Sequence, residues 1–428
     1  MQSEHMTRTG RWQRTGLAVT ALALAAALAG CGSVPTSQGT ETDGGGRTSS
    51  STSAPAQSEQ PTPSPTPDPV VFTSNVEDHA TDVKVDTTVA VKASGGTVSS
   101  VKLAYSGKDA DGNAKTMAVP GHLNKAHTAW SASTGLDPAT RYRLVMTGTS
   151  DQGVKTTTRS SFTTQQLSLD QQTFPTLYPL SGQKVGVGMP VIITFDVAVK
   201  DKAEFEKHLS VTTSPRQQGT WHWVSDTEVH FRPKHFWKPG TKVTVDANLN
   251  GVNAGGGIYG QHSRSTSFTI GRSVVTKIDL KRDKAKVYIN GKLSRTIKVS
   301  GGKPGFTTRS GTKLIMAKLR TTKMASETIG IADKNSPNYY SLDVEYAMRI
   351  TSSGEFLHAA PWNMAVFGRT NASHGCVGMS TADARWLFNT VSIGDPTITT
   401  GTSRGLEQGN GWSDWDVSYA KYKQGSAL

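Results

Sequence analysis

Cysteine is scarce in this sequence: only Cys31 and Cys376 occur in 428 residues. They lie far apart in segments of different character, which argues against a disulfide between them. Two cysteines without a Cys-x-x-Cys pair cannot form a cysteine-based metal site unaided. A buried core thiol is the plain alternative for Cys376, but its glycine and histidine neighbours favour a reactive thiol.

Acidic residues and apolar side chains are also in short supply. The sequence has 33 Asp and Glu against 46 Lys and Arg, giving a net charge of +13 and a pI of about 9.6. This balance fits an anionic partner. No Lys/Arg block and no nucleic-acid motif is present, so the pattern favours a diffuse anionic surface over nucleic acid. A hydrophobic content of 35% predicts some linker and otherwise polar-faced β-structure.

The first 30 residues are typical of an export signal. A basic start precedes a 14-residue apolar run, Gly16–Ala29, which is shorter than the ~20 residues of a membrane span. The run closes with Leu28-Ala29-Gly30-Cys31, which resembles the bacterial lipobox. That resemblance implies cleavage before Cys31, attachment of a diacylglycerol to its sulfur, and anchoring to the outer face of the cytoplasmic membrane. The alternative is an ordinary secretory signal with an incidental cysteine.

Three further segments separate the signal from the C-terminal part of the chain. Residues 31–69 are rich in Pro, Ser and Thr and predict an extended tether that reaches into the cell wall. Residues 70–165 and 166–272 show short alternating strands with turns between them, as in immunoglobulin-like sandwiches. Residues 138–144 resemble residues 239–245, so two tandem copies of one module are the best explanation.

The second module holds a group of aromatic and histidine residues. Trp221, His222 and Trp223 are consecutive, with His230 and His235 nearby. A metal site is conceivable, but strand alternation places the two tryptophans on one face and His222 on the other. Packing tryptophans and solvated histidines are therefore the default interpretation, and we predict neither a metal nor a cofactor.

The pattern changes again in the C-terminal region, residues 273–400. Strands are predicted around Asn290-Gly291, a strong hairpin signal. Residues 324–338 are polar and interrupted by glycine and proline, as expected of a mobile flap. Residues 382–388 are the best helix candidate. Residues 401–428 are expected to form a tail that packs on this domain.

The stretch Ser373-His374-Gly375-Cys376 suggests a cysteine nucleophile. A thiolate attacks, and free cysteine has a pKa near ~8.5, so an imidazole must take the proton. His374 lies two positions away and is better placed to form a wall. His358 follows an apolar strand and is assigned as the base, with its second nitrogen oriented by a backbone carbonyl such as that of Ala359. The amides of His374, Gly375 and Cys376 are candidates for an oxyanion hole.

His358, a gap of 14 residues and then Ser-His-Gly-Cys resemble the signature of the L,D-transpeptidases, the YkuD-type domain family. The resemblance spans about residues 273–400. The order of signal, tether, two immunoglobulin-like modules and catalytic domain resembles the actinobacterial, mycobacterial-type members. It implies a mainly β protein with two sandwiches before a β-rich catalytic domain.

The same resemblance implies the activity and further site residues. Cys376 would attack the diaminopimelate carbonyl of a donor tetrapeptide stem, release D-Ala, and pass the acyl group to an acceptor stem as a 3→3 cross-link. Carbapenems would acylate the same thiol. Tyr340 matches the flap tyrosine, and Ser353 and Gly354 match a substrate-contacting turn, with Ser373 beside the nucleophile.

One position departs from the family pattern. The family usually has asparagine two residues after the cysteine, and this sequence has Gly378, which offers only backbone contacts to substrate. Two alternatives stay open from sequence: an L,D-carboxypeptidase, in which water takes the acyl group, and a non-catalytic wall-binding lipoprotein.

Overall fold

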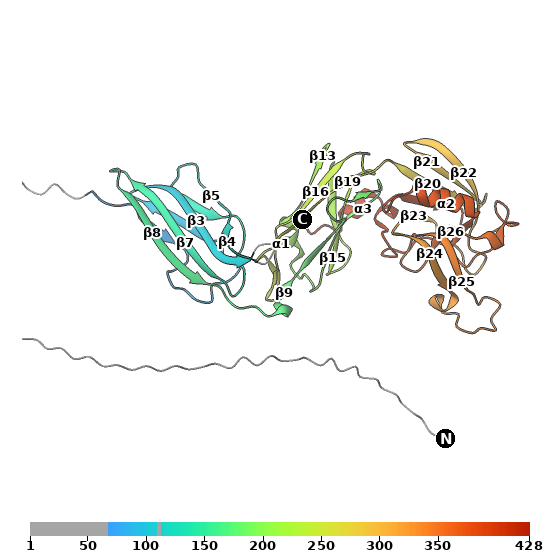
Figure 1. Cartoon of the computed structure of the whole chain (residues 1–428), viewed down its shortest axis with the longest axis horizontal. Helices are drawn as coiled ribbons and strands as arrows, with labels where there is room; N and C mark the ends of the chain where they lie inside the picture. Colours follow the sequence, from blue (N-terminus) through green and yellow to red (C-terminus); the bar gives the residue numbers. More distant parts are fainter. Residues whose placement is uncertain (1–66, 109–112) are drawn as a thin grey trace, which may run out of the picture. The chain divides into compact units, whose positions relative to one another are not determined.

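The structure is a computed structural model that describes residues 67–108 and 113–428 (Figure 1). The predicted export signal, Cys31 and the tether up to residue 66 lie outside the described residues. Within them the chain forms two β-sandwiches followed by a β-rich domain, which confirms the predicted fold class. No helix in this described part is long and apolar enough to cross a membrane.

The first sandwich consists of two four-stranded sheets. Its strands are β1 (Val71–Ser74), β2 (Ala90–Ser94), β3 (Gly96–Lys108), β4 (Ala114–Val119), β5 (Gly121–Leu123), β6 (Ala129–Ala132), β7 (Arg141–Ser150) and β8 (Lys155–Thr163). The sheet orders are β1-β2-β6-β5 and β4-β3-β7-β8. Strand β7 alternates exposed and buried residues along its first four positions, so Tyr142 and Leu144 enter the core beside Trp130 and Phe162 while the intervening residues face solvent.

The second sandwich repeats this design with an added short helix. Its elements are η1 (Leu169–Gln171), β9 (Gln172–Thr173), β10 (Pro175–Tyr178), β11 (Lys184–Val185), β12 (Val191–Phe195), α1 (Lys202–Lys207), β13 (Leu209–Ser214), β14 (Gly219–Trp223), β15 (Glu228–Pro233), β16 (Lys242–Ala247), β17 (Asn253–Gly255), β18 (Ile258–Gly260) and β19 (Arg264–Ile270). Sheets β10-β12-β15-β14 and β11-β19-β16-β13 enclose the core, and β17-β18-β9 form a small third sheet. Trp221 and Trp223 are buried and His222 faces the other way, which confirms the predicted alternation.

The third domain is built on one long sheet. Its elements are β20 (Val274–Asp279), β21 (Lys284–Ile289), β22 (Lys292–Ser300), β23 (Gly311–Leu314), β24 (Ala317–Ala325), η2 (Ser326–Ile329), β25 (Ser341–Arg349), β26 (Phe356–Ala359), η3 (Pro361–Asn363), β27 (Val377–Met379), α2 (Thr381–Thr390) and β28 (Pro396–Thr400). The nine strands run in the order β23-β28-β20-β21-β22-β27-β26-β25-β24. Asn290 and Gly291, both with positive φ, turn β21 into β22, and α2 covers the predicted helical segment with Ser380 as its N-cap, so both predictions are confirmed.

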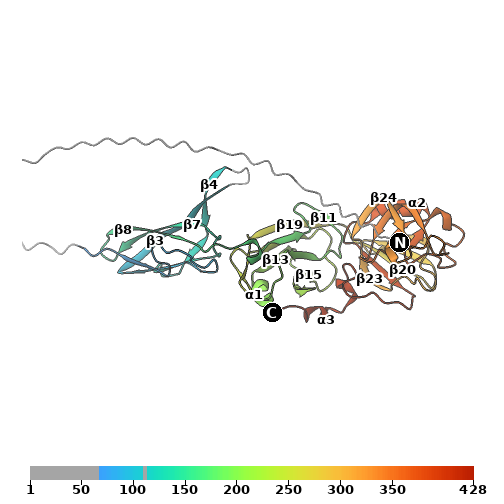
Figure 2. The same cartoon turned by 90° about the horizontal axis from the view of Figure 1, so that it is seen from below.

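The C-terminal tail contacts two domains. It contains η4 (Asp414–Asp416) and α3 (Tyr419–Lys423), and Figure 2 shows it running back along the second sandwich to α1. Asp416 accepts a hydrogen bond from the Thr312 amide of the third domain, as a tail packed there would. The rest of the tail extends beyond that prediction, because Trp415 donates to the Gly188 carbonyl and the amide of Ala427 donates to Glu206 in α1.

Two polar residues of the second sandwich hold this tail. His230 is buried, contrary to the solvated default, and its ring nitrogens lie 2.8 Å from Asp414 and 2.7 Å from Glu228. Arg232, only 2% exposed, packs over the rings of Trp415 and Tyr422, 4.5 and 4.4 Å from their centroids. Buried charge on the sandwich is thereby matched by carboxylate and aromatic groups of the tail.

Candidate active site

Cys376 lies immediately before β27, at the end of a tightly held loop. The Ser373 hydroxyl donates to the Cys376 carbonyl and accepts from the Gly375 amide at 3.1 Å. The Thr308 hydroxyl donates to the Gly375 carbonyl at 2.8 Å. Gly375 has φ +120°, a conformation that L side chains rarely adopt. Together these contacts fix the backbone of Cys376 and of the loop before it.

This loop geometry corrects one sequence prediction. The Gly375 amide already donates to Ser373, so it is occupied and does not offer its proton to a substrate oxyanion. Gly375 instead supplies the backbone conformation that the loop requires, and the Ser373 hydroxyl holds the backbone of Cys376.

His358 reaches the site from the neighbouring strand. Strand β26 is parallel to β27, and His358 is the register partner of Gly378. The Nδ1 of His358 donates to the Ala359 carbonyl at 2.8 Å, which is the acceptor expected from sequence. This hydrogen bond keeps the proton on Nδ1, so Nε2 carries the lone pair. Burial lowers the pKa of His358, so the ring is neutral at physiological pH.

The Cys376 sulfur lies in an enclosed setting, and its neighbours hold it as a thiol. The thiol donates to the Gly354 carbonyl, 3.6 Å from the sulfur. Burial raises the pKa of Cys376 to about 12, although a hydrogen bond from the Phe356 amide opposes this shift. Glu355 raises that pKa further and Lys313 lowers it. The resting pair is therefore a neutral thiol and a neutral imidazole.

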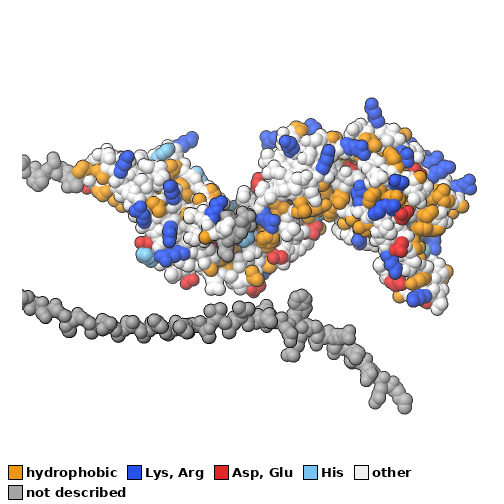
Figure 3. Space-filling model, in the orientation of Figure 1, with side chains coloured by type: hydrophobic (Ala, Val, Ile, Leu, Met, Phe, Trp, Pro, Cys, Tyr) orange, Lys and Arg blue, Asp and Glu red, His pale blue; other side chains and the backbone are white. Residues whose placement is uncertain are grey.

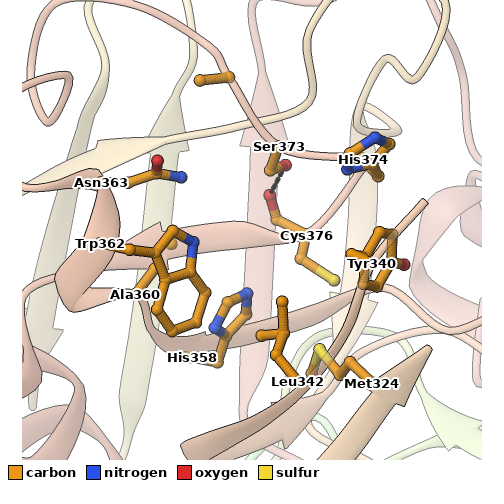
Figure 4. Close-up of a pocket in the computed structure, with 12 residues that line it drawn as sticks. Met324, Tyr340, Leu342, His358, Ala360, Trp362, Asn363, Ser373, His374 and Cys376 are labelled. Atoms are coloured by element: carbon orange, nitrogen blue, oxygen red, sulfur yellow. Dashed lines mark hydrogen bonds between the residues drawn. The ribbon is translucent and has the colours of Figure 1, made fainter. Parts of the chain in front are cut away.

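Several predicted binding residues surround the sulfur (Figure 4). The His374 ring contacts the rings of Tyr340 and Phe306, with centroid distances of 4.9 and 4.6 Å. His374 thus forms a wall, as expected, and burial lowers its pKa. The turn at Ser353 and Gly354 lies beside the thiol, and the Asn410 side chain of the tail accepts from the Ser353 amide at 2.9 Å.

Two hollows meet at the thiol. The smaller, of about 190 Å³, is lined by His358, Trp362 and Gly378 (Figure 4), and the Trp362 ring stacks 6.1 Å from that of His358. The larger, of about 730 Å³, extends past Gly354 and its wall includes basic side chains: Arg309, Lys323, Arg349 and Arg404. Cys376, Tyr340, His374 and Met324 border both, so a group bound in either hollow meets the same sulfur.

Gly378 occupies a tight position in this wall. A Cβ added there would lie 3.0 Å from the Ala360 Cβ and 3.6 Å from the Phe367 ring. The main chain of Gly378 pairs with both Ser300 and His358. A side chain at this position therefore requires a small movement of Ala360.

Sequence reasoning missed a buried charge cluster beneath the site. Glu355 accepts from the side chains of Arg309 and Lys313, each at 3.0 Å, and from the Arg309 amide. The Lys313 side chain is fully buried, and burial lowers its pKa despite Glu355. Because Arg309 follows Thr308, the cluster also anchors the segment that holds Gly375. Glu355 lies more than 40 positions after Arg309 and Lys313, and no motif connects it to them.

The described residues offer little for a metal. No group of three His, Cys, Asp or Glu suited to a metal ion occurs in residues 67–108 and 113–428. His222 and His230 are both engaged with the tail: His222 contacts the Tyr422 carbonyl at 2.8 Å, and His230 contacts Asp414.

The comparisons with known proteins agree with this fold and site. The model of the L,D-transpeptidase catalytic domain matches residues 273–399, and that of a bacterial Ig domain matches residues 80–253. L,D-transpeptidase 2 of Mycobacterium tuberculosis is 35% identical over 356 residues, 83% of this chain and 84% of that protein. The chain belongs to the L,D-transpeptidase family.

Two further relatives cover its C-terminal half. L,D-transpeptidase 1 of Mycobacterium tuberculosis is 35% identical over 226 residues, 52% of this chain and 83% of that protein. A solved L,D-transpeptidase in complex with imipenem is 34% identical, covering 53% of this chain and 97% of that chain with a TM-score of 0.46. The family confirms the transpeptidase activity expected from sequence.

Proposed function

We propose that this transpeptidase forms 3→3 peptidoglycan cross-links through a cysteine acyl-enzyme. The Cys376 sulfur attacks the carbonyl of the third residue of a tetrapeptide stem while Nε2 of His358 takes the thiol proton. The bond to the terminal D-Ala breaks, His358 protonates the leaving amine, and a thioester remains. An acceptor amine then attacks the thioester carbonyl and gives a proton to His358, and the bond to sulfur breaks as His358 passes that proton to the Cys376 sulfur.

One observation carries this proposal: a neutral imidazole with its proton fixed on Nδ1 shares a pocket with a neutral thiol. Burial raises the pKa of the Cys376 thiol, so the resting sulfur is protonated. The proton therefore leaves as the sulfur attacks. His358 on the adjoining strand supplies the base.

The two hollows support transfer between two stems. Both reach Cys376, so a donor held in one leaves the other open to an acceptor amine. The basic wall of the larger hollow, which includes Arg349 and Lys323, suits the carboxylates that stem peptides carry. Water in place of the acceptor would give the carboxypeptidase reaction instead.

The experiment is intact-mass analysis after incubation with a carbapenem, comparing wild type with Cys376→Ala and His358→Gln. We expect one adduct on wild type, none on Cys376→Ala and slowed acylation of His358→Gln. An adduct on Cys376→Ala, or on none of the proteins, overturns the nucleophile assignment. Product analysis with a tetrapeptide donor, with and without an acceptor stem, separates the two reactions: a donor that is only hydrolysed contradicts transpeptidation by this chain.

We also propose export and lipid anchoring through Cys31. The apolar run and the lipobox resemblance support it, as does a tether between Cys31 and the first sandwich. The enzyme would then act in the cell wall from the outer face of the cytoplasmic membrane. Cys31→Ala should abolish membrane association and the added lipid mass; a variant that stays in the membrane fraction with unchanged mass contradicts the anchor.

A further inference from the structure

One sheet of the first sandwich has a strongly one-sided charge. Strands β4, β3, β7 and β8, as the structure bounds them, contain no Asp or Glu. Their basic residues are Lys102, Lys108, Lys115, Arg141, Arg143, Lys155 and Arg159. The opposite sheet of the same sandwich holds a single basic residue, Lys92. The positive charge of this domain is therefore concentrated on one sheet.

Strand register places five of these side chains on the outer face. Lys102, Val145 and Arg159 lie side by side on adjacent strands, and the next row along β7 holds Arg143. Arg141 and Lys155 continue the same alternation, and all five basic side chains are exposed. Adjacent rows are separated by about 7 Å and adjacent strands by about 5 Å. The charges thus form a two-dimensional array, which we call the cationic face.

The cationic face is not neutralised from within. None of its five basic side chains forms an ion pair with another described residue. The Asp137 carboxylate nearby is already engaged with the Tyr105 hydroxyl. Figure 3 shows Lys and Arg side chains gathered over this part of the first sandwich. Like charges held close together without counter-ions favour an external anion.

A hollow at one end of the face adds hydroxyl groups to the charge. It encloses about 250 Å³ between Arg141 and Arg143, and its wall includes the hydroxyl residues Ser106, Thr116 and Thr140. Guanidinium groups bind phosphate and carboxylate with paired hydrogen bonds, and hydroxyls pair with hydroxyls. The combination fits one unit of a chain that carries both an anion and free hydroxyls.

We propose that the cationic face binds an anionic, hydroxyl-rich polymer, with a phosphodiester-linked polyol as the partner that fits best. An anionic membrane is the less favoured partner. The exposed large apolar residues of the described chain, such as Val71 and Leu169, lie outside these four strands, so the face offers nothing to insert between lipids. This binding is separate from catalysis and does not depend on Cys376.

The test compares two triple variants in the full chain, both carrying Cys31→Ala so that no lipid is attached. The arginine variant removes charge from the cationic face by Arg141→Gln, Arg143→Gln and Arg159→Gln. The lysine variant removes the same charge from exposed positions elsewhere on the first sandwich by Lys84→Gln, Lys92→Gln and Lys125→Gln. The probe is soluble poly(glycerol phosphate), and binding is measured at low and high salt.

We expect the Cys31→Ala parent and the lysine variant to bind alike, with affinity falling as salt rises. The arginine variant should lose roughly tenfold or more, the combined effect of three surface charge contacts. Polygalacturonate, which replaces phosphate by carboxylate, should compete, whereas neutral dextran should not. Equal losses in the two variants would mean that only net charge matters and would overturn the proposal.

Two further outcomes also overturn it: equal competition by dextran, and binding to phosphatidylglycerol vesicles that depends on the three arginines while polymer binding does not. Acylation of all three proteins by a carbapenem should remain equal, so a failed polymer test leaves the proposed catalytic function intact.

Discussion

Raising the pH through about 9 should weaken the attachment of the C-terminal tail to the second sandwich. Burial alone would lower the pKa of His230, but Asp414 and Glu228 outweigh it and raise that pKa from 6.5 to about 9. Because the folded value exceeds the unfolded one, the stabilisation is complete below pH 6.5 and is lost as the pH rises through 9. The difference corresponds to about 3 kcal/mol.

Asp414 limits the pH range of tail attachment on the acidic side. Burial alone would raise its pKa, but His230 and the Tyr422 hydroxyl outweigh burial and lower it. A lowered carboxyl pKa gives stabilisation that is present above the unfolded value and is lost as the pH falls through the folded one. The attachment of the tail should therefore be strongest between weakly acidic and neutral pH.

Hydrogen exchange in residues 412–428, together with urea unfolding, would measure this from pH 6 to 10. His230→Asn should remove the alkaline dependence of tail protection. His222→Asn is the matched control, because His222 stacks on Tyr422 of the same tail and contacts its carbonyl without a carboxylate partner. If wild type and His230→Asn lose protection from hydrogen exchange along the same pH curve, the attachment of the tail does not depend on the charge of His230.

Three further predictions concern the catalytic domain. Lys313→Met should lower the free energy of unfolding by about 3 kcal/mol in urea titrations, because Glu355 loses a buried partner. The double variant Lys313→Met/Glu355→Leu should lose less of this free energy, and a greater loss in the double variant contradicts the argument. Gly378→Asn should speed carbapenem acylation in mass time courses, more so with Ala360→Gly, which relieves the 3.0 Å contact; unchanged or slower rates in both variants refute the missing-amide argument. Thr308→Val should lower kcat roughly tenfold with KM nearly unchanged, because the Gly375 carbonyl loses its hydroxyl donor, and Thr308→Ser should restore kcat. An unchanged kcat in Thr308→Val would show that the Gly375 carbonyl needs no donor.

Local chemistry made much of the fold predictable. Asn290-Gly291 determines a hairpin because both residues accept positive φ, and alternation around Trp221 and Trp223 determines which side is core. The hydrogen-bond partner of His358 was also predictable: this histidine lies near the end of an apolar strand, so a neighbouring carbonyl was the expected acceptor, and Ala359 supplies it. These inferences use neighbours in sequence.

What the sequence left open depends on distant partners. Glu355 pairs with Lys313 and Arg309, more than 40 positions away, and an isolated charged residue gives no sign of such a cluster. His230 was taken for a solvated histidine because Asp414, its partner, stands 184 positions later. The amide of Gly375 was misassigned because its bond to Ser373 depends on the exact loop path.

The return of the tail to the second sandwich restricts how the third domain can move. The chain leaves that sandwich near residue 271, traverses the catalytic domain, and is fastened to the sandwich again by Trp415 and Ala427. Backbone hydrogen bonds from Gly186 and Gly188 to Ile393 and Gly394 add a third point of attachment. Because the third domain is attached to the second sandwich at several points, we expect Cys376 to move together with that sandwich. Movement that brings this site to a substrate must then come from segments earlier in the chain.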